Sequence, residues 1–205
     1  MKIGVIDYGA SNIFSVVRAL NSLGASTKIL KKSKDFENID KLVFPGQGSM
    51  GACLKKLSEN DLRDALIFSL KNLPFLGICL GLQILFSESE ESEDEKGLGI
   101  FPEKIKKFSE FKDMTIKIPH MGWNEIISQK HVLFNDILQG TDFYFVHSYY
   151  FKTKTADHCI ATTSYPNSIT AAVCKENIFG TQFHPEKSHK NGKKIIDNFL
   201  KWETV

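Results

Sequence analysis

The sequence predicts an α/β fold: an open, mostly parallel sheet with helices on both faces, plus an antiparallel extension. Up to residue 78, short and almost wholly apolar runs alternate with segments of helical periodicity, a pattern typical of parallel strands covered on both faces. Later strand-like runs follow one another without helical segments between them, which indicates antiparallel pairing. The chain has 205 residues, enough to bury a full core, and we expect a single domain over residues 1–205.

The first half of the chain supplies the parallel strands. Residues 2–7, 27–30, 41–44 and 75–78 have the apolar character of strands. A first helix has its apolar face at Ile13, Phe14, Val16, Val17, Leu20 and Leu23. Ser11 or Asn12 is suited to cap the start of this helix, and Gly24 is suited to end it. A second helix is predicted over residues 62–70.

The pattern changes near residue 87. Residues 87–95 carry six acids in nine positions, which indicates a solvated loop. Beyond them, strands are predicted over residues 115–118, 142–150, 159–164 and 169–182. The chain closes with a helix whose apolar face is formed by Ile195, Ile196, Phe199 and Leu200.

Composition excludes several classes of protein. The net charge of +2 gives no sign of nucleic-acid binding. No apolar run approaches the ~18 residues that a membrane span requires. The four cysteines form no C-x-x-C pair, and no His/Cys spacing matches a zinc site. We therefore expect a cytoplasmic protein with free thiols, no metal and no cofactor.

Gly77-Ile78-Cys79-Leu80-Gly81 is the strongest local signal. It follows an apolar strand and precedes residues 82–86, a candidate helix start, in the glycine–x–nucleophile–x–glycine pattern of a nucleophile elbow. The helix N-terminus would favour a thiolate at Cys79, and the Leu80 amide would face a developing oxyanion. A buried structural cysteine is the alternative interpretation.

A thiolate nucleophile needs a proton carrier, and His184 is the candidate. Pro185 stiffens the link from His184 to Glu186, whose carboxylate could orient the imidazole. An ordinary surface turn is the alternative, since spacing alone does not place His184 beside Cys79.

Residues 46–51 match G-x-G-x-x-G after a strand. A dinucleotide site would need an acid at the end of the next strand, which ends in glycine and cysteine instead. A loop whose free amides face a carboxylate or an oxyanion is the better interpretation.

Taken together, these segments resemble the class I glutamine amidotransferases. Within that family they resemble most the glutaminase subunits of imidazole glycerol phosphate synthases, across essentially the whole chain. The broad resemblance rests on the cysteine elbow and on GTQFHPEKS at 180–188, and the narrower one on PHMGWN at 119–124, FVHSYY at 145–150 and the Lys-Ser after His-Pro-Glu.

The resemblance implies roles for particular residues. Cys79 would attack the glutamine amide, His184 would relay protons and Glu186 would orient it. The oxyanion hole would comprise Gly46, Gln47, Gly48 and Leu80, on a strand that related enzymes can turn away until a partner binds. Gln83, Ser148 and Tyr149 would hold L-glutamine, and Trp123, Asn124 and Lys187 would lie near the partner.

The resemblance also implies a partner, a (β/α)8-barrel cyclase subunit that receives ammonia in a heterodimer. The acceptor would be a ribotide of histidine biosynthesis, with a sugar of surface-polysaccharide synthesis as the alternative. Other classes remain open on the residues alone. A redox sensor would not need His-Pro-Glu, and PGQGS at 45–49 suits a small carboxylate better than the peptide groove of a cysteine protease.

Overall fold

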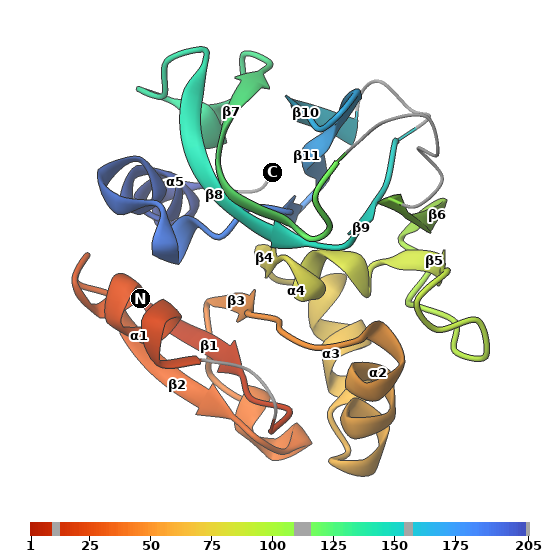
Figure 1. Cartoon of the computed structure of the whole chain (residues 1–205). Helices are drawn as coiled ribbons and strands as arrows, with labels where there is room; N and C mark the ends of the chain where they lie inside the picture. Colours follow the sequence, from red (N-terminus) through yellow and green to blue (C-terminus); the bar gives the residue numbers. More distant parts are fainter. Residues whose placement is uncertain (10–12, 109–115, 154–157, 204–205) are drawn as a thin grey trace.

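The fold, taken from a computed structural model, is described for residues 1–9, 13–108, 116–153 and 158–203. Within these ranges the main sheet has nine strands in the order β2-β1-β3-β4-β12-β11-β10-β7-β8 (Figure 1). Pairing is parallel from β2 to β12 and antiparallel from β12 to β8. The predicted parallel sheet with an antiparallel extension is therefore confirmed.

The strands of the main sheet are β1 (Lys2–Ile6), β2 (Ser26–Leu30), β3 (Lys41–Phe44), β4 (Phe75–Ile78), β7 (His120–Ser128), β8 (Thr141–His147), β10 (Cys159–Ser164), β11 (Ser168–Lys175) and β12 (Ile178–Thr181). A smaller sheet contains β5 (Phe86–Ser89), β6 (Phe101–Lys107) and β9 (Tyr149–Tyr150). The α-helices are α1 (Ile13–Asn21), α2 (Met50–Glu59), α3 (Arg63–Leu70), α4 (Leu80–Gln83) and α5 (His189–Lys201). Short 3-10 turns lie at Ser33–Phe36, Val132–Phe134 and Pro185–Lys187.

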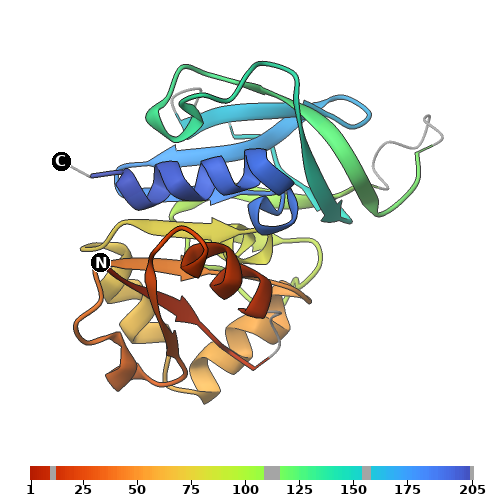
Figure 2. The same ribbon diagram turned by 90° about the vertical axis from the view of Figure 1, so that its left-hand side faces the viewer.

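Two hydrophobic clusters lie on the two faces of the sheet. Helices α1 and α5 cover one face, and α2 and α3 cover the other (Figures 1 and 2). Successive residues of β3 point to opposite clusters, Val43 to the first and Leu42 and Phe44 to the second, as the two-residue period of a strand requires. Both faces of the central strands are thus buried, which explains why their sequences lack polar alternation.

Most predicted elements are confirmed, with corrections to α1 and α4. Phe14 is not on the buried face of α1, because 76% of it is exposed, and the proposed caps Ser11 and Asn12 lie outside the described residues. The helix expected over residues 82–86 is wrong: α4 ends at Gln83 and Phe86 begins β5. Helix α2 and strands β6 and β7 were not predicted.

Two further expectations in the middle of the chain are wrong. Residues 116–118 do not form a strand, and Thr115 lies outside the described residues. Residues 87–95 are not simply a solvated loop. Ser89 is buried in β5, Glu91 Oε2 accepts from the Met50 amide at 2.8 Å and Ser92 Oγ accepts from the Gly51 amide at 2.9 Å. The acidic segment therefore satisfies free amides at the N-terminus of α2.

Candidate active site

Cys79 lies in a sharp turn between β4 and α4. Its backbone has φ 52° and ψ −103°, a conformation that non-glycine residues rarely adopt and that clusters at functional sites. The flanking glycines make the turn possible. A Cβ on Gly77 would lie 2.5 Å from the Gly81 carbonyl oxygen, and one on Gly81 would lie 2.0 Å from the Phe44 carbonyl oxygen. The predicted nucleophile elbow is therefore present.

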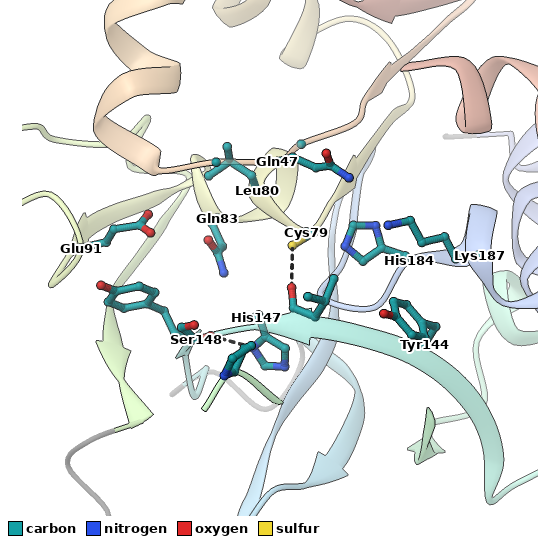
Figure 3. Close-up of a pocket in the computed structure, with 15 residues that line it drawn as sticks. Gln47, Cys79, Leu80, Gln83, Glu91, Tyr144, His147, Ser148, His184 and Lys187 are labelled. Carbon is teal, nitrogen blue, oxygen red and sulfur yellow. Dashed lines mark hydrogen bonds between the residues drawn. The ribbon is translucent and has the colours of Figure 1, made fainter. Parts of the chain in front are cut away.

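Parallel pairing brings His184 to Cys79. Strand β12 runs beside β4 with Thr181 opposite Ile78, so both strands end at the same edge of the sheet. The Cys79 amide donates to the Thr181 carbonyl at 2.7 Å. His184 follows β12 by three residues and lies beside Cys79 above this edge (Figure 3). Ligand sites of α/β sheets form where strands end in this way.

Glu186 orients the His184 ring. His184 Nδ1 lies 2.8 Å from Glu186 Oε1, with both side chains at least 95% buried. Nε2 on the other side of the ring is buried and meets no hydrogen-bond partner within the described residues. Burial alone would lower the pKa of His184, but Cys79 and Glu186 together raise it to about 10. The arrangement favours a positively charged imidazolium at His184.

Two hydrogen-bonded side-chain amides lead to the Cys79 sulfur. Gln182 Nε2 donates to Cys79 Sγ at 3.4 Å, and Gln83 Nε2 donates to Gln182 Oε1 at 3.0 Å. Cys79 Sγ also lies 3.9 Å from the Val146 carbonyl oxygen (Figure 3). Gln182 was missed by sequence reasoning, although it stands two residues before His184 in the quoted motif.

These groups border a cavity of about 430 Å³. Its lining includes every predicted oxyanion and glutamine-binding residue: Gly46, Gln47, Gly48, Leu80, Gln83, Ser148 and Tyr149. Glu91 also lines it, across the cavity from His184 (Figure 3). Burial raises the pKa of Glu91. Sequence reasoning missed Glu91 because it stood among five other acids.

Two hydrogen bonds with Tyr8 hold the loop before α2. The Tyr8 hydroxyl donates to the Gln47 carbonyl at 2.6 Å and accepts from the Gln47 amide at 3.1 Å. Gly46 packs on the elbow so closely that a Cβ there would lie 2.4 Å from Leu80 Cβ. The predicted oxyanion loop and the cysteine elbow are therefore in direct contact.

Of the three predicted interface residues, Lys187 alone is among the described residues that line the cavity. Its Nζ lies 5.7 Å from the centre of the Tyr144 ring. Trp123 is 47% exposed and stacks on His189 with ring centres 5.0 Å apart. Asn124 Nδ2 contacts the ring of His120 and donates to the Ser164 carbonyl. The segment PHMGWN was predicted to follow a strand. That prediction is wrong, because His120 itself begins β7.

The described residues offer neither a metal-binding cluster nor a membrane-spanning helix. They contain no group of three or more His, Cys, Asp or Glu arranged to hold a metal ion. They also contain no helix with the length and apolar character needed to cross a bilayer.

Comparisons with known proteins agree with this geometry. The model of the family described as glutamine amidotransferase class-I matches residues 4–202. The chain is 42% identical to imidazole glycerol phosphate synthase subunit HisH of Chromobacterium violaceum, over 99% of both chains. It is 44% identical to the HisH subunit of Nitrosomonas europaea, over 98% of both.

Solved structures are similar in fold. A crystal structure of a glutamine amidotransferase superposes with a TM-score of 0.74 at 17% identity, covering 97% of each chain. The PurLQS structure from Thermotoga maritima gives 0.74 at 18% identity, covering 98% of this chain and 97% of the other. At this level of identity, the similarity establishes the α/β fold alone.

Proposed function

The chain belongs to the class I glutamine amidotransferases, and within them to the HisH subunits of imidazole glycerol phosphate synthase, and from this premise we propose that it hydrolyses glutamine through a thioester on Cys79. One observation carries the proposal. A strained cysteine faces a buried histidine whose far nitrogen is 2.8 Å from a carboxylate oxygen. That is the nucleophile, base and orienting group that acyl transfer needs.

The chemistry follows from these positions. The Cys79 thiolate attacks the side-chain amide carbon of glutamine, and the carbonyl oxygen becomes an oxyanion. The first amide of α4, at Leu80, would donate to this oxygen, and the Gly46–Gly48 loop would complete the oxyanion hole once its amides turn toward the cavity. His184 gives its proton to the departing nitrogen, so ammonia leaves and a glutamyl thioester remains. His184 then takes a proton from water, which attacks the thioester and releases glutamate.

The substrate's amino-acid end has matching groups in the cavity. We assign its binding to Gln83, Ser148 and Tyr149, which line the cavity. Figure 3 shows Gln83 and Ser148 on the side of Cys79 away from His184. Glu91 supplies a carboxylate for the α-ammonium of glutamine. Glu91 Oε2 already accepts from the Met50 amide, so substrate binding and the start of α2 share one side chain.

Ammonia passes to a partner subunit rather than to solvent. The relatives are named as one subunit of a synthase, which supports a heterodimer. We propose that the partner is a (β/α)8-barrel cyclase contacted by Trp123, Asn124 and Lys187, of which Lys187 lines the cavity (Figure 3). The whole chain, residues 1–205, would act as one glutaminase domain in the cytoplasm, without a metal or cofactor.

The acceptor for ammonia is proposed to be the ribotide precursor of imidazole glycerol phosphate in histidine biosynthesis. The similarity to HisH subunits over nearly the whole chain favours it. A sugar-amidating synthase would use the same glutaminase chemistry and is the alternative acceptor system.

Replacing the nucleophile tests the proposed function. The Cys79→Ala variant, assembled with the cyclase partner, should lose glutamine-dependent synthase activity and keep activity with added ammonia. Cys53→Ala is a matched control, because Cys53 is buried within α2 in the opposite hydrophobic cluster, and this variant should keep glutamine-dependent activity. Full glutamine-dependent activity in Cys79→Ala would contradict the proposal.

A further inference from the structure

Tyr8 lies beneath the predicted oxyanion loop and outside the cavity. It follows β1, is 1% exposed and packs edge-on against Phe44 with ring centres 5.5 Å apart. Its hydroxyl reaches Gln47 and contacts both polar groups of that residue's backbone. Tyr8 is not among the cavity-lining residues, so its hydroxyl bonds draw the Gln47 backbone toward the protein interior.

The two hydrogen bonds fix two peptide planes. The Gln47 amide belongs to the plane shared with Gly46, and the Gln47 carbonyl belongs to the plane shared with Gly48. Burial raises the pKa of Tyr8, so the phenol stays protonated and keeps its donor hydrogen. While the Gln47 amide donates to this hydroxyl at 3.1 Å, its single hydrogen is not available to an oxyanion in the cavity.

Glycines on both sides of Gln47 leave these planes otherwise easy to turn. Gly48 has φ +96°, and a Cβ at this residue would meet nothing within 4 Å. Gly46 has no side chain to restrict its ψ angle. The orientation of the Gln47 amide therefore depends strongly on its partners, and Tyr8 supplies the partner for each of its polar groups.

Resting on the proposed glutaminase function, we propose that the Tyr8 hydroxyl is a positioning group that withholds the Gln47 amide from the oxyanion. When both bonds break, the plane between Gly46 and Gln47 can turn and present the amide to the cavity. The loop would then stabilise the tetrahedral intermediate together with Leu80. Tyr8 thus sets the fraction of molecules with a complete oxyanion hole.

Removing the hydroxyl alone tests this role. Tyr8→Phe keeps the ring and its packing on Phe44 but loses both bonds to Gln47. In the isolated chain, glutaminase kcat should rise roughly 5- to 30-fold, the shift expected when one or two net hydrogen bonds are removed. KM for L-glutamine should stay within about twofold, because the substrate-binding side chains are untouched.

Two variants separate this effect from a general change in packing. Ser22→Ala removes a hydroxyl that donates to the Ala19 carbonyl at 2.8 Å near the end of α1, and should leave kcat unchanged. Tyr8→Leu removes the same hydroxyl together with the ring. It should also raise the partner-free kcat while lowering the melting temperature.

The outcomes distinguish this proposal from the proposed function. If the wild-type complex releases glutamate but partner-free kcat in Tyr8→Phe is equal to or below that of the wild-type chain, the withholding role is wrong. If the wild-type complex releases no glutamate, the glutaminase function fails and the role of Tyr8 fails with it.

Discussion

The surroundings of His184 suit the two proton transfers that the proposed mechanism gives it. Its Nδ1 faces Glu186, which fixes the ring's orientation, and its Nε2 is left buried and without a partner among the described residues. A nitrogen kept dry and unpaired beside a sulfur is ready to exchange a proton with a substrate. The carboxylate's contribution is therefore to hold the tautomer and stabilise the charged ring.

Glu186→Gln should lower the kcat of the complex by about 10²- to 10⁴-fold, because the neutral amide no longer stabilises the imidazolium or selects its tautomer. KM for glutamine should change little. Steady-state glutamate release measures both constants. Glu59→Gln, on the exposed end of α2, is the control and should behave as wild type. A kcat within twofold of wild type in Glu186→Gln would show that the carboxylate is only structural.

The sequence supported the reactive residues better than their surroundings. Cys79 and His184 stand in motifs that the family resemblance linked to one another, and the structure places both at one cavity. Gln182 and Tyr8 act through contacts 103 and 39 residues away in the chain, which no local pattern reveals. Long-range partners of ordinary polar residues are therefore what sequence reasoning misses.

At the scale of elements, strands β7 and β8 carry a hydrogen-bond chain. His120 and His147 are paired across these strands, with His120 Nδ1 2.9 Å from His147 Nε2. His147 Nδ1 lies 2.7 Å from the Tyr149 carbonyl oxygen, so this nitrogen carries the hydrogen. The other two contacts of this series join His120 Nδ1 to His147 Nε2 and Asn124 Nδ2 to His120 Nε2. Each of them pairs one donor with one acceptor only if both imidazole rings are neutral.

These two histidines should make stability depend on pH. Burial lowers the pKa of His120 to about 4 and that of His147 to about 3, against 6.5 ordinarily. Both take up a proton on unfolding below pH 6.5, so the free energy of unfolding should fall as pH drops from 6.5 toward 4. The maximum slope is about 1.4 kcal/mol per pH unit for each histidine.

Urea unfolding at several pH values measures this dependence. His120→Phe places an aromatic ring between Phe145 and Tyr165, against which His120 stacks, and removes one titrating group. Its unfolding free energy should vary less steeply between pH 4 and 6.5 than that of wild type. If the pH dependence of the unfolding free energy were unchanged in His120→Phe, His120 would take up its proton in the folded chain at the same pH as in the unfolded chain.

A buried lysine from β3 hydrogen-bonds the C-terminal end of α5. Lys41 Nζ donates to the Phe199 carbonyl at 3.0 Å and to the Trp202 carbonyl. Lys41→Met keeps the apolar stem but leaves both carbonyls without this donor, and should cost about 1–3 kcal/mol of unfolding free energy. Lys55→Met, on the exposed face of α2, should cost less than about 0.5 kcal/mol. Equal losses in the two variants, measured by urea denaturation, would contradict the cap.

Elements with a plain apolar pattern were predicted, and those with mixed patterns were not. Strand β6 alternates buried and exposed positions but carries Pro102 and three lysines, which are unusual in strands. Helix α2 buries Met50, Cys53, Leu54 and Leu57 at helical spacing, yet its start overlaps the glycine loop that drew attention to a ligand site. Tertiary contacts, rather than the local sequence pattern, determine the secondary structure of such segments.

At the scale of the whole molecule, one sheet edge organises the site. Strands β4 and β12 deliver Cys79 and His184, and the loop after β3 delivers Gln47. The exposed Trp123 ring lies 6.0 Å from the ring of the cavity-lining Tyr144, centre to centre, and Lys187 Nζ lies 5.7 Å from the centre of the same Tyr144 ring. An exposed tryptophan beside a catalytic cavity is a candidate anchor for a partner subunit.

Trp123→Ala should therefore weaken partner binding by roughly 10- to 100-fold without changing the melting temperature of the isolated chain. Titration by isothermal calorimetry measures the dissociation constant. Leu138→Ala is the matched control, because Leu138 is 80% exposed at the other end of the β7–β8 hairpin. Equal affinities for wild type and Trp123→Ala would move the interface elsewhere on the surface.

The central claim is that Cys79 carries the glutamyl group during turnover. The most direct test is to quench the wild-type complex in acid while it consumes isotope-labelled L-glutamine, then locate the label by peptide mass spectrometry. We predict label on the peptide that contains Cys79, and no label on the corresponding peptide of Cys79→Ala. Glutamate production with no label on Cys79, or with label on another cysteine, would contradict the account.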